Sequence, residues 1–69
     1  MRFRIEYFNV GAPRGSEEHP GPIAAACEYA AKNLAKRDAN AARVINSASL
    51  TEVRLVKPDG SGGYTVNDA

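Results

Sequence analysis

The stretch RFRIEYFNV, residues 2–10, decides the fold class of this chain. Its first half places an apolar residue at every second position, at Phe3, Ile5 and Tyr7, with charged residues between them. A period of two is that of a β-strand with one buried and one exposed side. We therefore predict a strand over Arg2–Val10 whose apolar side packs on a core. Phe8 falls on the charged side of this strand.

The composition restricts the chain to one small domain, residues 1–69. At 69 residues, a domain buries only about 60% of the surface that its unfolded chain exposes. Twelve of the residues are alanine, which leaves few large side chains for a core. We expect one thin apolar layer between a helix and a sheet, with no room for a buried cofactor or an enclosed substrate pocket.

Charge and cysteine content indicate where the protein works. Lys and Arg number nine against eight Asp and Glu, so the molecule has no strong field to attract nucleic acid or an anionic membrane. The single cysteine, Cys27, cannot form an internal disulfide, and a secreted domain of this size usually needs several. No signal-peptide pattern is present, and no apolar run approaches the roughly 20 residues of a membrane span. We expect a cytoplasmic protein that does not bind membranes.

A long loop and a helix follow the first strand. The stretch GAPRGSEEHPGP, Gly11–Pro22, is rich in Pro and Gly and predicts a loop. The stretch PIAAACEYAAKNLAKR, Pro22–Arg37, predicts a helix, because proline suits the first helical position, where the backbone N–H has no partner. At helical spacing, one apolar stripe would face the sheet; it consists of Ile23, Cys27, Ala30 and Leu34.

Residues 38–49 are open to two interpretations. They could form a short helix capped by Asp38, or a strand over Arg43–Ser47. The strand is slightly favoured, because Val44 and Ile45 are adjacent β-branched residues and the Asn and Ser residues near them serve a helix poorly.

The end of the chain predicts a hairpin. Leu50–Lys57 alternates as a strand, with Thr51, Val53 and Leu55 on one side and Leu50, Glu52, Arg54 and Val56 on the other. The turn KPDGSGG, residues 57–63, leads into a short strand over Tyr64–Asn67. The fold class is therefore α+β, in the order strand, helix, strand, strand, with one helix packed on a three-stranded, mostly antiparallel sheet.

No cluster of residues indicates catalysis or metal binding. His19 follows Glu17 and Glu18, but three consecutive loop residues do not form the fixed three-ligand set of a catalytic zinc site. Cys27 lies in the apolar stripe, which is typical of a small buried hydrophobe. The stretch GSGG, residues 60–63, lacks the Lys-Ser/Thr of a P-loop. We expect no catalytic, cofactor or metal site, and no enzyme.

Two surfaces are candidates for binding. If the helix covers the sheet face that bears Phe3, nothing else in the chain covers the other face. That face could be a solvated one with cross-strand ion pairs, or an interface of mixed apolar and basic character. Its candidate residues are Arg2, Arg4, Phe8 and Arg54. The second candidate surface lies on the outer side of the helix and comprises Tyr29, Lys32 and Lys36.

In size and layout the chain resembles the small anti-CRISPR proteins of phages and mobile elements. The stretches that carry the resemblance are MRFRIEYFNV, PIAAACEYAAKNLAKR and LTEVRLVKPDGSGGYTV, which together cover most of the chain. Anti-CRISPR proteins share no common motif, so no functional residue can be carried over. The resemblance implies an inhibitor in the bacterial cytoplasm that binds a CRISPR effector complex and blocks target DNA recognition or nuclease recruitment.

We therefore expect that the protein binds a protein partner and is not an enzyme. We also expect it to be a monomer. The alternative is a small nucleic-acid-binding accessory module. A phosphate-binding groove needs clustered Lys and Arg, and an RNA-binding sheet needs two or three exposed aromatic residues. Because Phe8 is the one aromatic residue that the pattern exposes on the sheet, and acidic residues are interleaved with the basic ones, direct nucleic-acid binding is not favoured.

Overall fold

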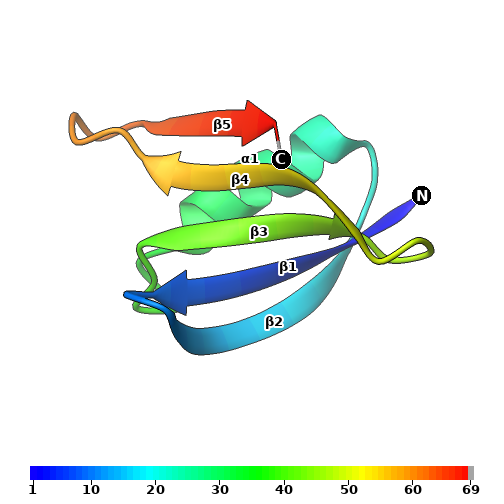
Figure 1. Cartoon of the computed structure of the whole chain (residues 1–69). Helices are drawn as coiled ribbons and strands as arrows, with labels where there is room; N and C mark the ends of the chain where they lie inside the picture. Colours follow the sequence, from blue (N-terminus) through cyan, green and yellow to red (C-terminus); the bar gives the residue numbers. More distant parts are fainter. Residues whose placement is uncertain (69) are drawn as a thin grey trace.

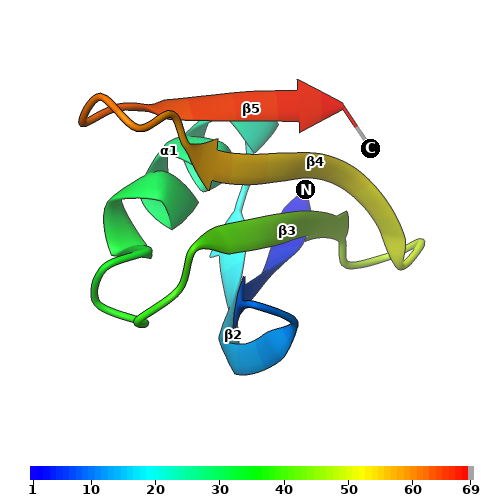
Figure 2. The same ribbon diagram turned by 60° about the vertical axis from the view of Figure 1, so that its left-hand side comes forward.

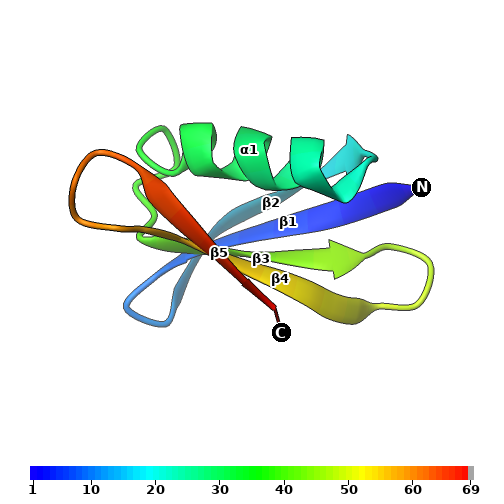
Figure 3. The same cartoon turned by 90° about the horizontal axis from the view of Figure 1, so that it is seen from above.

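In the computed structural model, which describes residues 1–68, one helix lies across one face of a five-stranded antiparallel sheet (Figure 1). The elements are β1 Arg2–Asn9, β2 Ala12–Pro20, α1 Ile23–Asn33, β3 Ala41–Asn46, β4 Thr51–Pro58 and β5 Tyr64–Asp68. The strand order is β2-β1-β3-β4-β5. The α+β class and the helix on an antiparallel sheet are confirmed, whereas the prediction of three strands is wrong. Figure 3 shows α1 on one side of the sheet and no element on the other.

The core lies between α1 and the central strands. The buried side chains of β1 are Phe3, Ile5 and Tyr7, as the alternation predicts. The helix contributes Ala26, Cys27 and Ala30, and Leu34, at its C-cap, is buried with them, while Ile23 packs at the margin of the core. Because most of these helix residues are small, α1 can lie close to the sheet. Between residues 1 and 68, no helix is long and apolar enough to cross a membrane.

The prediction of a loop over Gly11–Pro22 is wrong, because most of it forms the strand β2. This strand pairs with β1 from Arg2 opposite Pro20 to Asn9 opposite Ala12. The connecting residues, Val10 and Gly11, have φ angles of 48° and 80°, which gives the twist of a two-residue hairpin turn. Since β2 is an edge strand, it has no neighbour on its outer side and can carry proline without losing a ladder hydrogen bond.

The helix is shorter than predicted and the strand interpretation of residues 38–49 is confirmed. Pro22 stands at the N-cap, and α1 ends at Asn33, four residues before Arg37. The chain then turns, and Asp38 adopts a left-handed conformation with φ 52°. The strand β3 begins at Ala41, two residues before the predicted start, and lies between β1 and β4 in the middle of the sheet.

The predicted faces of β4 are wrong beyond Val53. Ile45 pairs with Glu52, but the adjacent Val44 pairs with Arg54, so Val53 is an extra residue in β4. A β-bulge of this kind turns the following side chains to the opposite face and bends the strand, as Figure 2 shows for β4. Val56 is consequently buried under α1 and Leu55 lies on the uncovered face.

Candidate functional site

The face of the sheet opposite α1, hereafter the open face, is built by the alternate residues of the strands. Arg4, for example, pairs with Glu18 on one side and with Ile45 on the other, and residues paired in this way share a face. The side chains that the register places on it include Arg2, Arg4, Glu6, Phe8, Ser16, Glu18, Arg43, Ile45, Glu52 and Leu55. Three of the four sheet residues predicted for this surface, Arg2, Arg4 and Phe8, therefore lie on it together.

Arg54 does not belong to the open face. The bulge at Val53 places it opposite Val44, a core residue, on the side of the sheet that α1 covers. Its guanidinium donates to the Val53 carbonyl oxygen at 2.7 Å and pairs with the Asp68 carboxylate at 3.1 Å. The prediction of Arg54 as an open-face residue is thus corrected; this arginine joins β4 to β5.

The charges of the open face are paired with one another. Arg2 pairs with Glu18 at 3.7 Å, and Arg4 pairs with Glu6 at 3.4 Å. Arg43 pairs with Glu52 at 3.2 Å. Exposed ion pairs of this kind each contribute only about 0–1 kcal/mol to folding stability. Their main effect is that the open face carries interleaved opposite charges instead of a continuous basic field.

Apolar groups lie among these ion pairs. Phe8, Ile45 and Leu55 are all only half-buried and are not covered by any other element of the described chain. The Arg43 guanidinium lies over the Phe8 ring, with its carbon 4.3 Å from the ring centroid, which is a cation–π contact. The open face therefore interleaves apolar side chains with ion-paired charges.

A shallow hollow adjoins the open face at the β1–β2 hairpin. Its volume is about 340 Å³, and it is lined by Phe8 and Arg43 from the sheet and by Gly11, Pro13 and Gly15 from the hairpin. It is open to solvent and has room for a side chain of a partner.

The second candidate surface is divided by the structure. Tyr29 turns toward β2, where its ring lies 4.6 Å from the His19 ring. Lys32 pairs with Glu28, one turn earlier on α1, at 3.4 Å. Lys36 follows the end of α1 and is exposed. Lys32 and Lys36 remain on the outer surface, but Tyr29 contributes to the contact between α1 and β2.

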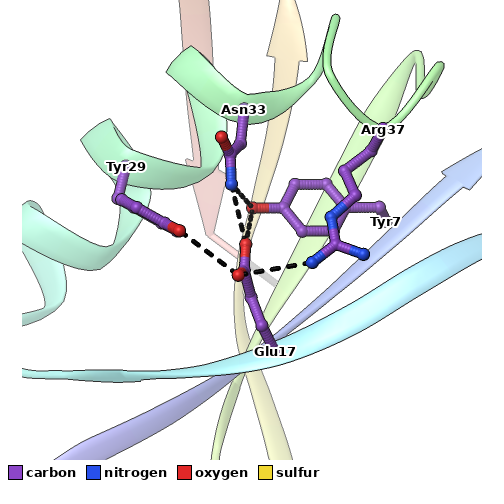
Figure 4. A network of polar contacts seen from close by, with 5 residues as sticks. All are labelled: Tyr7, Glu17, Tyr29, Asn33 and Arg37. Carbon is purple, nitrogen blue, oxygen red and sulfur yellow. Dashed lines mark hydrogen bonds and ion pairs between the residues drawn. The ribbon is translucent and has the colours of Figure 1, made fainter.

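That contact is a polar network centred on Glu17 (Figure 4). One carboxylate oxygen accepts hydrogen bonds from the Tyr7 hydroxyl and the Asn33 amide, both at 2.8 Å. The other accepts from Tyr29 at 3.2 Å and pairs with Arg37 at 3.3 Å. The network fastens the edge strand β2 to α1, so it supports the fold and offers no free reactive group.

The ionisation of the network follows from these contacts. Burial alone would raise the pKa of Glu17, but the hydrogen bonds from Tyr7, Asn33 and Tyr29 and the charge of Arg37 together lower it. Burial also raises the pKa of the Tyr7 hydroxyl above its usual value, so this group stays protonated and can donate. Glu17 is therefore an ionised acceptor surrounded by donors.

The remaining reactive residues are separated from one another. Glu17 and Glu18 point to opposite faces of the sheet, because neighbouring residues of a strand alternate. Cys27 is buried, and burial raises the pKa of its thiol, as expected for a core residue. Within residues 1–68, no group of three or more His, Cys, Asp or Glu side chains is placed to hold a metal ion.

Three open-face residues, Arg43, Ile45 and Leu55, were missed by the sequence-based selection. The adjacent Val44–Ile45 pair pointed to a strand, but without its register no face could be assigned to Arg43.

Comparisons of the chain with models of protein families, with curated proteins and with solved structures found no match. The functional conclusion consequently rests on the geometry of the open face.

Proposed function

We propose that this chain is a non-enzymatic binding protein whose open face contacts a protein partner. The observation that carries the proposal is an uncovered sheet face on which Phe8, Ile45 and Leu55 lie beside the stacked guanidinium of Arg43. Arginine and aromatic side chains are enriched where protein–protein interfaces have their strongest contacts. The strands fix the backbone of these residues, so little backbone order has to be gained on binding.

The charge balance favours a protein over a nucleic acid as the partner. Each of the three arginines on the open face has a glutamate within ion-pair distance. A phosphate backbone would have to displace these carboxylates, whereas a protein surface with both charge signs can exchange ion pairs with them. Phe8 is also a single exposed ring and not the row of stacking rings that an RNA-binding sheet presents.

The resemblance to anti-CRISPR proteins suggests the partner and the consequence of binding. The proposed partner is a CRISPR effector complex in the bacterial cytoplasm, and the proposed action is stoichiometric inhibition, by blocking target DNA recognition or nuclease recruitment. A domain with an exposed, mixed face and no strong net charge suits this role, because it binds a protein surface without imitating DNA.

The test is inhibition of target DNA binding by purified effector complexes, with and without the protein. We expect the wild type to inhibit at least one effector type, and the double variant Arg4→Glu/Arg43→Glu to lose at least tenfold in potency. The matched control is Lys32→Glu, a charge reversal on the outer side of α1, which should inhibit like the wild type. Equal potency of all three proteins would remove the open face from consideration.

A separate binding measurement distinguishes the nucleic-acid alternative. The wild type should show no appreciable affinity for an oligonucleotide in the absence of effector. An affinity that falls steeply with salt, and that Arg4→Glu/Arg43→Glu abolishes, would assign the open face to phosphate contacts instead.

A further inference from the structure

The two edges of the sheet are protected to different degrees. The outer strand β2 carries Pro13 and Pro20, which lack an N–H, and its Glu17 is fastened to α1. Prolines, charges and covering elements are the means by which proteins prevent an edge strand from pairing with another chain. At the opposite edge, β5 has the sequence YTVND, Tyr64–Asp68, with neither proline nor lysine. All five of its residues are exposed.

The β5 edge also exposes apolar side chains and has no free charge. Val66 pairs with the fully buried Val56 but is itself 41% exposed, and Tyr64 on the same side is 42% exposed. The helix packs mainly on β1, β3 and β4, so β5 lies beyond the part of the sheet that α1 covers (Figure 1). The one charged residue of the strand, Asp68, is paired with Arg54 at 3.1 Å.

We propose that β5 pairs with β5 of a second copy of this chain, antiparallel and around a two-fold axis at Val66. In this register Val66 faces its own counterpart, Thr65 faces Asn67, and Tyr64 faces Asp68. The exposed backbone of β5 gains hydrogen-bond partners, and the two exposed valine side chains cover each other. The two sheets become one continuous sheet with a symmetric, isologous contact.

Charge selects this arrangement over a parallel one. A parallel pairing in register would place the two Asp68 carboxylates side by side. In the antiparallel register they stand four residues apart along the strand, or about 14 Å, which exceeds the screening length of roughly 8 Å in physiological salt. The self-complementarity of the strand is the reason to assign a second copy as its occupant.

The symmetry has a consequence for the open face. A two-fold axis perpendicular to the sheet keeps both helices on one side, so the open faces of the two copies lie together on the other side. The proposed dimer differs from the monomer that we expect from the sequence alone. Because the contact is a single short strand pair, the dimer should be weak and dependent on concentration.

Sedimentation velocity of the full chain over a range of concentrations tests the dimer. We expect the mass to rise from that of a monomer to that of a dimer, and Val66→Lys to stay monomeric because two like charges would then face each other. Ser16→Lys, the matched change on the β2 edge, should dimerise like the wild type. A wild type that remains monomeric up to about 1 mM overturns the proposal. The β5 edge would then be a site for pairing with a strand of another protein.

Disulfide trapping tests the register. Facing residues of an antiparallel pair have Cα atoms about 4.5–5.5 Å apart, within the range that a disulfide bridges. Val66→Cys should therefore form a covalent dimer on mild oxidation, whereas Tyr64→Cys, about 14 Å from its counterpart in this register, should not. The wild type should not cross-link, since Cys27 is buried. Equal trapping of the two variants, or trapping of neither, contradicts the two-fold axis at Val66.

Discussion

The Arg43 guanidinium lies 4.3 Å from the centre of the Phe8 ring, and its Nε is 3.2 Å from the Glu52 carboxylate. Three strands, β1, β3 and β4, thus meet at one side chain on the face that the helix leaves uncovered. These two contacts orient the Arg43 guanidinium in the free protein, which would lower the entropic cost of the proposed binding.

The Phe8–Arg43 contact should be measurable in the free protein. A double-mutant cycle with Phe8→Ala, Arg43→Ala and the double variant should give a coupling free energy of about 0.5–1 kcal/mol, the usual size of an exposed cation–π contact. Urea unfolding supplies the four free energies. Strictly additive effects of the two substitutions would show that the stacked geometry does not stabilise the fold.

Glu17 should matter more for stability than its neighbour Glu18. Glu17→Ala leaves the part-buried donors of Tyr7 and Asn33 without their acceptor, so we expect a loss of about 1–3 kcal/mol in the free energy of unfolding. Glu18→Ala, on the exposed open face, should cost less than about 1 kcal/mol. Chemical denaturation of both variants makes the comparison, and equal losses would contradict the role assigned to the network.

The same network predicts a dependence of stability on pH. The pKa of Glu17 is lowered on folding from its ordinary 4.5, so the folded state binds the proton less readily than the unfolded state. This contribution is fully present above about pH 4.5 and is lost as the pH falls through the folded-state pKa. Unfolding free energies measured from pH 6 down to about 3 should decline less for Glu17→Gln than for the wild type. Parallel curves would exclude Glu17 as the source.

Val10 should be replaceable with a gain in stability. It is a β-branched residue at the first position of a two-residue turn, where its φ is 48° and its side chain is 90% exposed. Asparagine tolerates this left-handed conformation, and Asn-Gly is the preferred sequence for such a turn. Val10→Asn should stabilise the protein by about 1 kcal/mol, seen as a higher Tm, while Val10→Ser should give less. A lower Tm for Val10→Asn would contradict the turn geometry.

Alternation and helical spacing predicted the elements that supply most of the core. Phe3, Ile5 and Tyr7 are buried because a strand with one covered face must place every second residue inward. Cys27 and Leu34 are buried because residues seven apart lie on the same side of a helix. Both patterns are local, so no tertiary information was needed.

The missed features depend on non-local pairing. Proline and glycine in Ala12–Pro20 predicted a loop, but the outer side of an edge strand needs no N–H, so these residues do not prevent pairing with β1. The bulge at Val53 follows from how β4 meets β3 and leaves no mark in the alternation of β4 itself. Arg54 was consequently assigned to the wrong face, and Arg43 was not selected.

The most direct test of the open face as a binding surface is methyl cross-saturation by NMR, on the labelled protein mixed with an unlabelled CRISPR effector complex, its proposed partner. Ile45 and Leu55 present their methyl groups on the open face, whereas those of Ile23 and Ala24 belong to α1 on the opposite side. We predict that saturation of the effector reduces the signals of Ile45 and Leu55 and spares those of Ile23 and Ala24. Loss of the α1 signals with those of Ile45 and Leu55 unchanged would contradict the account.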